Sequence, residues 1–212
     1  MNLAFAIAAV VVAAASGWPA NVLIARLSNA AAAQRSWSTL LLAVVAAALV
    51  LLVAVRLHQL LVASAVGWLV LAGVPLAVID ARVRRLPDVL TLTCFAAVAV
   101  LLTAAGATTG HWPDLARAAA GAAIAAALFL LPALLRPGSA GLGDAKLGLS
   151  TGALAAWAGW GVLLGSVFAA FALAAIYGLA LLVSGRASLR SSVPFGPFML
   201  AGCVAVVLLA RR

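Results

Sequence analysis

The feature that most constrains this chain is an uncharged segment of 37 residues that runs from Leu147 to Val183. As a single helix it would be about 55 Å long, because an α-helix rises about 1.5 Å per residue. The hydrocarbon core of a bilayer is only about 30 Å thick and takes about 20 residues to span. We therefore expect two membrane helices joined by a turn near Trp157–Gly161, where tryptophans and glycines suit a membrane interface.

Similar segments recur along the chain, which is 67% hydrophobic and 8% charged, with a mean hydropathy of +1.27. This composition excludes an ordinary soluble domain. We expect an all-α fold, a polytopic membrane helix bundle of about eight transmembrane helices, with residues 1–212 forming a single membrane-embedded domain. The predicted spans are Leu3–Ile24, Thr39–Val55, Leu60–Ile79, Val89–Thr108, Ala118–Leu135, Leu147–Gly159, Gly161–Val183 and Phe195–Ala210.

Basic residues predict the orientation of these spans. None precedes the first span and Arg26 follows it, which favours a retained helix over a cleaved signal peptide. Of the 13 basic residues, nine fall in one set of alternate loops, which we expect to be cytoplasmic. We interpret the net charge of +9 as orientation signals and contacts with anionic lipid headgroups, and expect no nucleic-acid partner. The nine are Arg26, Arg35, Arg82, Arg84, Arg85, Arg136, Lys146, Arg186 and Arg190.

All four acidic residues are aspartates, and three of them fall on the predicted cytoplasmic side. These three are Asp80, Asp88 and Asp144, whereas Asp114 falls on the opposite side. Asp80 directly follows an apolar span, and a carboxylate near the middle of a span costs about 2.5–3.5 kcal/mol. The plain interpretation of Asp80 is an interfacial residue that pairs with Arg84 on the next turn.

Asp144 follows two glycines, Gly141 and Gly143, and precedes an apolar segment. The plain interpretation is that it is the N-cap of the following helix. The functional interpretation takes Asp80 and Asp144 together, because two carboxylates that meet at one membrane face can share a proton. The ionised one would remove a proton from water while the protonated one donates to the scissile carbonyl oxygen of a peptide. The glycines would then leave room for a substrate backbone.

The cysteines and histidines do not form a pattern typical of a metal site. Cys94 and Cys203 lie inside apolar segments, so we interpret them as small buried hydrophobic residues. His58 and His111 fall on the side opposite the three aspartates, where we interpret them as interfacial loop residues. We therefore expect hydrolysis without a metal or other cofactor.

Three segments in order along the chain resemble motifs of the type IV prepilin peptidases, a family of G-x-G-D membrane aspartic proteases. The resemblance covers most of the chain from about residue 70, with a catalytic region at about 70–200. A fainter resemblance, at Gly17–Leu27, is to the end of the first helix of that family. The three segments are Ile79-Asp80 with Leu86-Pro-Asp88, Gly141-Leu-Gly-Asp-Ala-Lys-Leu147, and Val193-Pro-Phe-Gly-Pro-Phe198.

The resemblance implies an enzyme that removes the short basic leader from type IV prepilins or pseudopilins, in pilus assembly or protein secretion. It implies a multi-pass protein of the cytoplasmic (inner) membrane, with Asp80 and Asp144 as the catalytic pair facing the cytoplasm. In bifunctional relatives a cytoplasmic insertion with two C-x-x-C pairs accompanies an N-methyltransferase activity. Residues 27–37 form only a short loop without cysteine here, so we expect a form that is a protease only.

Six residues are candidates to contact the substrate. Asp88 would attract the basic leader. The plain interpretation of Lys146 is a lysine that extends to the membrane surface, and the functional one is a contact with substrate or an electrostatic influence on the two aspartates. Pro194 and Gly196 set the start of the last span, and Gly196 would let that segment pack beside the active site. The six are Gly141, Gly143, Lys146, Asp88, Pro194 and Gly196.

Two other classes of function remain open from the residues alone. A proton-coupled transporter or channel also uses carboxylates within a membrane bundle, although no clear repeat relates the two halves of this chain. A presenilin-like intramembrane protease shares the G-x-G-D element. Its first motif has a tyrosine before the aspartate, whereas here that residue is Ile79 and the only tyrosine is Tyr177.

Overall fold

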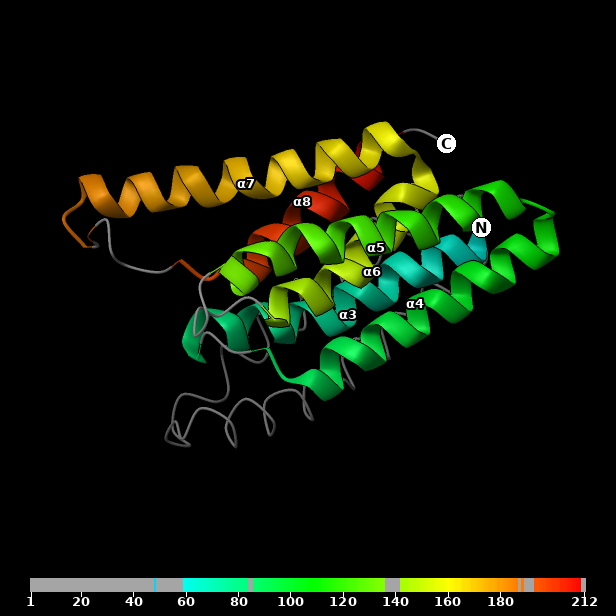
Figure 1. Cartoon of the computed structure of the whole chain (residues 1–212), viewed down its shortest axis with the longest axis horizontal. Coiled ribbons are helices and arrows are strands. Elements are labelled where there is room, and N and C mark those ends of the chain that lie inside the picture. Colours follow the sequence, from blue (N-terminus) through cyan, green and yellow to red (C-terminus); the bar gives the residue numbers. More distant parts are fainter. Residues whose placement is uncertain are drawn as a thin grey trace.

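The computed structural model describes residues 48, 59–83, 86–135, 142–186, 188 and 193–210. Every regular element in these ranges is an α-helix, which confirms the predicted all-α class (Figure 1). The first two predicted spans lie outside the described residues apart from Ala48, and so does the loop at 27–37. The helices are α3 (Leu60–Val83), α4 (Asp88–Thr109), α5 (Trp112–Leu135), α6 (Leu142–Ala158), α7 (Trp160–Val183) and α8 (Gly196–Leu209).

Successive helices run in opposite directions along the bundle (Figure 1). Helices α3, α4, α5 and α7 contain apolar segments of 20 to 24 residues, which is long enough to cross a membrane. Helices α6 and α8 are shorter, with 17 and 14 residues. The described part of the chain therefore has the architecture of a multi-pass membrane protein.

Each of the last six predicted spans corresponds to one of these helices, but two helices begin earlier than predicted. Helix α5 begins at Trp112 rather than Ala118, and α6 begins at Leu142 rather than Leu147. The reason is that both helices carry charged residues in their first turns. Apolarity marks the part of a helix that lies in the bilayer, whereas the hydrogen-bonded helix continues into the polar interface.

Glycines end two of the helices in backbone conformations that other residues rarely adopt. Gly110 caps α4 with a φ of 75°, and its N–H donates to the carbonyl of Gly106. Gly159 has a φ of 143° and separates α6 from α7, which confirms the predicted turn within the 37-residue segment. These turns return the chain across the bundle, so that every second connection lies at the same end.

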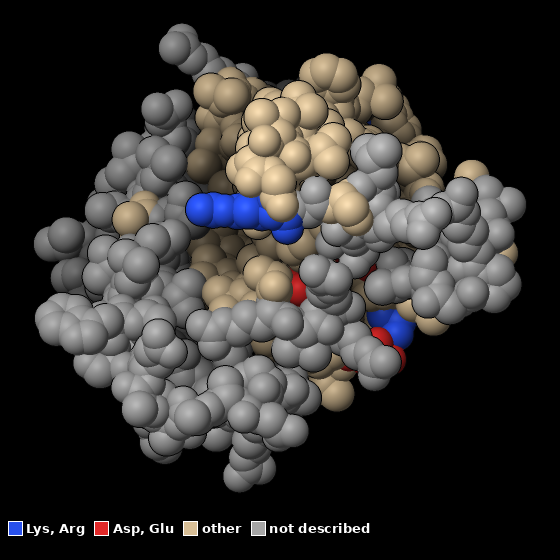
Figure 2. Space-filling model, turned by 90° about the vertical axis from the view of Figure 1, so that its left-hand side faces the viewer, with Lys and Arg blue, Asp and Glu red and all other residues tan. Residues whose placement is uncertain are grey.

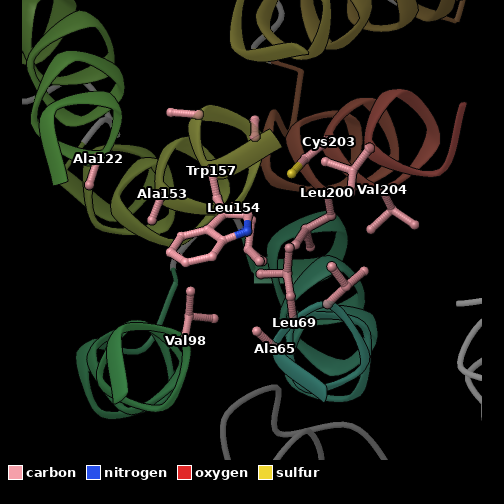
Figure 3. Close-up of a cluster of buried hydrophobic side chains, with 14 of the residues drawn as sticks. Ala65, Leu69, Val98, Ala122, Ala153, Leu154, Trp157, Leu200, Cys203 and Val204 are labelled. Carbon is pink, nitrogen blue, oxygen red and sulfur yellow. The ribbon is translucent and has the colours of Figure 1, made fainter. Parts of the chain in front are cut away.

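Helix α6 lies at the centre of the described bundle and contacts α3, α4, α5, α7 and α8. In Figure 3, Leu154 and Trp157 of α6 lie among side chains of the surrounding helices, including Val98 of α4 and Leu69 of α3. Most of α6 is buried, in contrast to α7, whose apolar side chains are largely exposed. Asp144, in the first turn of α6, is therefore carried by the most enclosed helix of the described part.

Small residues bring α5 and α6 into close contact. A Cβ atom added at Gly121 of α5 would overlap the Cβ of Ala156, and one added at Gly152 of α6 would lie 2.5 Å from the carbonyl oxygen of Gly121. Membrane helices associate through such small residues because van der Waals contact, rather than the hydrophobic effect, drives their packing. This crossing fixes the position of α6 relative to α5.

Candidate active site

The antiparallel arrangement places three predicted site segments at one end of the bundle. This end holds the last turn of α3, the first turn of α6 and the start of α8, with Asp80, Asp144 and Gly196 respectively. Figure 2 looks onto this end, where one group of acidic atoms is visible near the centre and another lies beside a basic side chain. The structure thus brings together the two aspartates and the Pro194–Gly196 segment that the sequence singled out.

Asp80 is buried, with 6% of its surface exposed, and it contacts the start of α8. Its Oδ2 accepts a hydrogen bond of 2.9 Å from the backbone N–H of Gly196. The first N–H groups of a helix have no partner within the helix and carry partial positive charge, so this position favours a carboxylate. The predicted partner, Arg84, lies outside the described residues.

Gly196 is the residue type that this contact requires. A Cβ added to it would lie 2.9 Å from Oδ2 of Asp80 and 3.4 Å from its Cγ. The absence of a side chain therefore lets the N-terminus of α8 approach the carboxylate. The sequence placed this loop beside the active site, and the structure adds the hydrogen bond and its atoms.

Asp144 is the third residue of α6 and lies three residues before the apolar segment that starts at Leu147, so it precedes the apolar part of this helix. The prediction that Asp144 is the N-cap of this helix is wrong, because the helix already begins at Leu142. Burial and, secondly, the charge of Asp80 raise the pKa of the Asp144 carboxyl from 3.8 to about 7. The two aspartates are therefore close enough to influence each other's ionisation.

Gly143 contacts the connection between α3 and α4. A Cβ added to Gly143 would lie 2.8 Å from the Cβ of Leu86, which is itself partly buried against the core. This contact gives Gly143 a packing role that the sequence did not predict, while its predicted role in admitting substrate stays a prediction. Gly141 lies outside the described residues.

Asp88 and Lys146, both candidate substrate contacts, pair with each other. The Nζ of Lys146 lies 2.5 Å from Oδ1 of Asp88, and their side chains are 29% and 65% exposed. Lys146 extends to Asp88 on α4, so its charge is directed to that carboxylate. An exposed pair of this kind contributes only about 0–1 kcal/mol, which leaves both groups able to exchange partners with a charged ligand.

An aromatic cluster holds the segment that leads into α8. The ring of Phe195 lies 5.4 Å from that of Phe129 on α5 and 5.0 Å from that of Phe171 on α7, measured between centroids. The rings of Phe129 and Phe171 are 6.0 Å apart. Sequence reasoning missed Phe129 and Phe171, because phenylalanines on two apolar helices carry no spacing signal that links them to a loop near the site.

The fourth aspartate belongs to a separate cluster at the opposite end of the bundle. Asp114 pairs with Arg117 at 2.7 Å, and Nδ1 of His111 lies 3.9 Å from its other oxygen. Arg117 also donates hydrogen bonds to the carbonyls of Ala156 and Trp157 at the end of α6. This cluster satisfies carbonyls at the C-terminus of α6 and confirms that His111 and Asp114 lie away from Asp80 and Asp144.

The two cysteines are buried and free, which confirms their interpretation as buried residues of the core. The thiol of Cys203 donates to the carbonyl of Thr151 at 3.4 Å. Among the described residues there is no group of three or more histidine, cysteine or acidic side chains that could hold a metal ion.

Comparison with known proteins places this sequence in a family. Two curated relatives, from Burkholderia pseudomallei strains 1026b and K96243, are each named prepilin leader peptidase/N-methyltransferase. The chain is 38% identical to each over 139 residues, which cover 62% of this chain and 42% of the relative. The chain thus spans less than half the length of these relatives. No solved structure shows significant similarity to it.

The matched family range contains the first two of the three motifs, and the third, at Val193–Phe198, lies beyond it. Residues 64–179, more than half of the chain, match the type IV leader peptidase family. That range contains Asp80 and Asp144 together with α4, α5 and α6, which connect and position them. On this match, the chain belongs to the type IV leader peptidase family.

Proposed function

We propose that this chain is a membrane aspartic endopeptidase that removes the short basic leader from type IV prepilins or pseudopilins at the cytoplasmic face of the membrane. The observation that carries this proposal is the placement of Asp80 and Asp144, two carboxyl groups from different helices, at one end of the bundle, where the charge of Asp80 also acts on Asp144. Such a pair supplies a base and an acid for peptide hydrolysis without a covalent intermediate.

The surroundings of the two carboxyl groups assign a role to each. Asp80 accepts the N–H of Gly196 at the N-terminus of α8, which favours its ionised form. Asp144 is the partner whose raised pKa, about 7, favours its protonated form. In this assignment Asp80 is the general base and Asp144 is the general acid.

The reaction then proceeds in two balanced steps. Asp80 takes a proton from water as the water oxygen attacks the scissile carbonyl carbon, and Asp144 donates its proton to the carbonyl oxygen. In the second step the carbon–nitrogen bond breaks, the proton on Asp80 passes to the leaving amine, and the proton on the former carbonyl oxygen returns to Asp144. Both carboxyl groups end in their starting states.

The charges near the site are suited to a basic leader. Asp88 is exposed and its ion pair with Lys146 lies in contact with solvent, so a lysine or arginine of the leader could replace Lys146 as its partner. Anionic lipid headgroups at the same membrane face would add to this attraction. The apolar helix of the substrate would remain in the bilayer while the leader reaches the two aspartates.

We further propose that the chain acts as a protease only. The curated relatives carry N-methyltransferase in their names. Residues 27–37 contain no cysteine, whereas a zinc-type insertion would need four ligands there. Incubation with radiolabelled S-adenosylmethionine and mature pilin should give no methyl transfer, and measurable transfer would contradict this part of the proposal.

The function is tested with the purified chain in lipid vesicles and a prepilin encoded in the same genome. We expect mass spectrometry to show loss of the leader after a single cut, and the same yield in the presence of a chelator. A double variant, Asp80→Asn with Asp144→Asn, is the matched control and should leave the prepilin intact. A wild-type chain that is folded yet leaves several prepilins uncut would overturn the proposal.

A further inference from the structure

A groove between α3 and α8 extends from the candidate active site into the membrane-spanning part of the bundle. Its volume is about 390 Å³, and all of the described residues that line it are apolar. In Figure 3, Leu69 of α3 lies opposite Leu200 and Val204 of α8, which form part of its walls. The lining residues that matter here are Leu69, Gly73, Ala77, Pro197, Ala201 and Ala205.

The groove is continuous with the contact between Asp80 and Gly196. Ala77 lies one turn before Asp80 on α3, and Pro197 directly follows Gly196 on α8. Asp80, Ala77 and Gly73 share one face of α3, because residues three, four and seven apart on a helix are neighbours. A polypeptide that reaches Asp80 therefore has the groove directly beside it on the membrane side.

The shape and chemistry of the groove fit an apolar helix. It carries alanine on both walls, as Ala77 on α3 and as Ala201 and Ala205, at i and i+4, on α8. Such small residues let a further helix approach closely. The lining offers no partner for free backbone groups, so a polypeptide in the groove must satisfy its own hydrogen bonds as a helix.

The length of the groove sets how much of such a helix it holds. Along α8 the lining extends from Pro197 to Leu208, about 16 Å at 1.5 Å per residue. This length corresponds to about three helical turns of an occupant lying alongside. The floor is closed near Gly73, where an added Cβ would lie 2.8 Å from a methyl group of Leu200.

We propose that this groove binds the first three turns of the substrate's apolar helix, on the C-terminal side of the bond that is cut. The inference rests on the proposed function, because it identifies how the prepilin is held at that same site. The leader then extends to the membrane surface near Asp88, and the cleaved bond lies between the groove and the two aspartates. Cleavage just before an apolar helix follows from this arrangement.

The first test fills the groove. The variant Ala205→Phe places a bulky ring in it about two and a half turns away from Gly196. The variant Ala123→Phe makes the same change at an exposed alanine on α5. With full-length prepilin in vesicles, Ala205→Phe should raise KM about tenfold or more and change kcat little, whereas Ala123→Phe should change neither. A short soluble peptide that lacks the apolar helix should be cleaved at the same rate by both variants.

The second test locates the substrate directly. A photo-cross-linking amino acid at position 205 should capture the prepilin through its apolar helix, and the same group at position 123 should not. Equal KM values for the two phenylalanine variants, or cross-linking from position 205 only to lipid or within the chain itself, would overturn the groove proposal. Both results require a wild-type chain that cleaves, so they are distinct from failure of the proposed function.

Discussion

Replacing Gly196 with alanine tests whether the N-terminus of α8 activates Asp80. The new Cβ would lie 2.9 Å from Oδ2 and 3.4 Å from Cγ of Asp80, so the carboxylate or the helix must move by a few tenths of an ångström. That movement removes or weakens the 2.9 Å hydrogen bond from the Gly196 N–H. A hydrogen bond to a charged group contributes about 1.5–3 kcal/mol.

The expected loss of rate follows from this energy. Losing the bond disfavours the ionised, proton-accepting form of Asp80 by up to this energy, and each 1.36 kcal/mol changes the population of that form about tenfold, so kcat should fall by up to about 10- to 150-fold. The assay is leader removal from prepilin in lipid vesicles, measured at saturating substrate. KM should change less than kcat, because the hydrogen bond acts on the base rather than on the bound prepilin.

A matched control separates this effect from a general cost of adding a methyl group. An added Cβ at Gly161 has no heavy atom within 4 Å, so Gly161→Ala should leave kcat nearly unchanged. Thermal unfolding in detergent would show whether both variants remain folded. A folded Gly196→Ala variant with the kcat of the wild type would refute the role of this N–H.

Three further predictions concern the acid, the surface charges and the helix crossing. Asp144 must be protonated to act as the acid, and its pKa is raised to about 7, so kcat should decline as the pH rises through about 7. A rate that stays constant to pH 9 would count against Asp144 as the acid. The charge reversal Asp88→Lys should raise KM for a prepilin with a basic leader, whereas Lys146→Ala should lower this KM by freeing Asp88. Unchanged KM values in both variants would show that Asp88 does not bind the leader. In the variant Gly152→Leu the new Cβ would lie 2.5 Å from the carbonyl oxygen of Gly121. This change should lower the free energy of unfolding by at least about 1–3 kcal/mol. A stability equal to that of Gly161→Ala would show that α5 and α6 separate freely.

The sequence predicted the features that depend on position along the membrane normal. Long apolar segments marked the helices, the glycine-rich turn at Gly159 divided the longest segment, and alternation of loops put Asp80 and Asp144 at one end. These inferences succeed because the thickness of the bilayer and the antiparallel order fix the depth of each residue. The same argument placed Asp114 at the other end.

The contacts within the site could not be predicted in this way. The bond from Gly196 to Asp80, the pair of Asp88 with Lys146, and the contact of Phe195 with two other rings depend on how each helix is rotated about its axis. A soluble helix reveals its rotation through one apolar face, but these helices are apolar on nearly all sides. Rotation is set instead by small-residue crossings such as that at Gly152, which are evident only once two helices are seen together.

The most direct measurement of the central claim is leader removal by the two single variants, Asp80→Asn and Asp144→Asn, beside their double variant. If the carboxyl groups act as one base and one acid, each single change should abolish cleavage nearly completely, and the double variant should be no slower than either. Each variant must still bind prepilin, which cross-linking from position 205 would report. Wild-type cleavage by either folded single variant, or losses that multiply in the double variant, would contradict a catalytic pair made of Asp80 and Asp144.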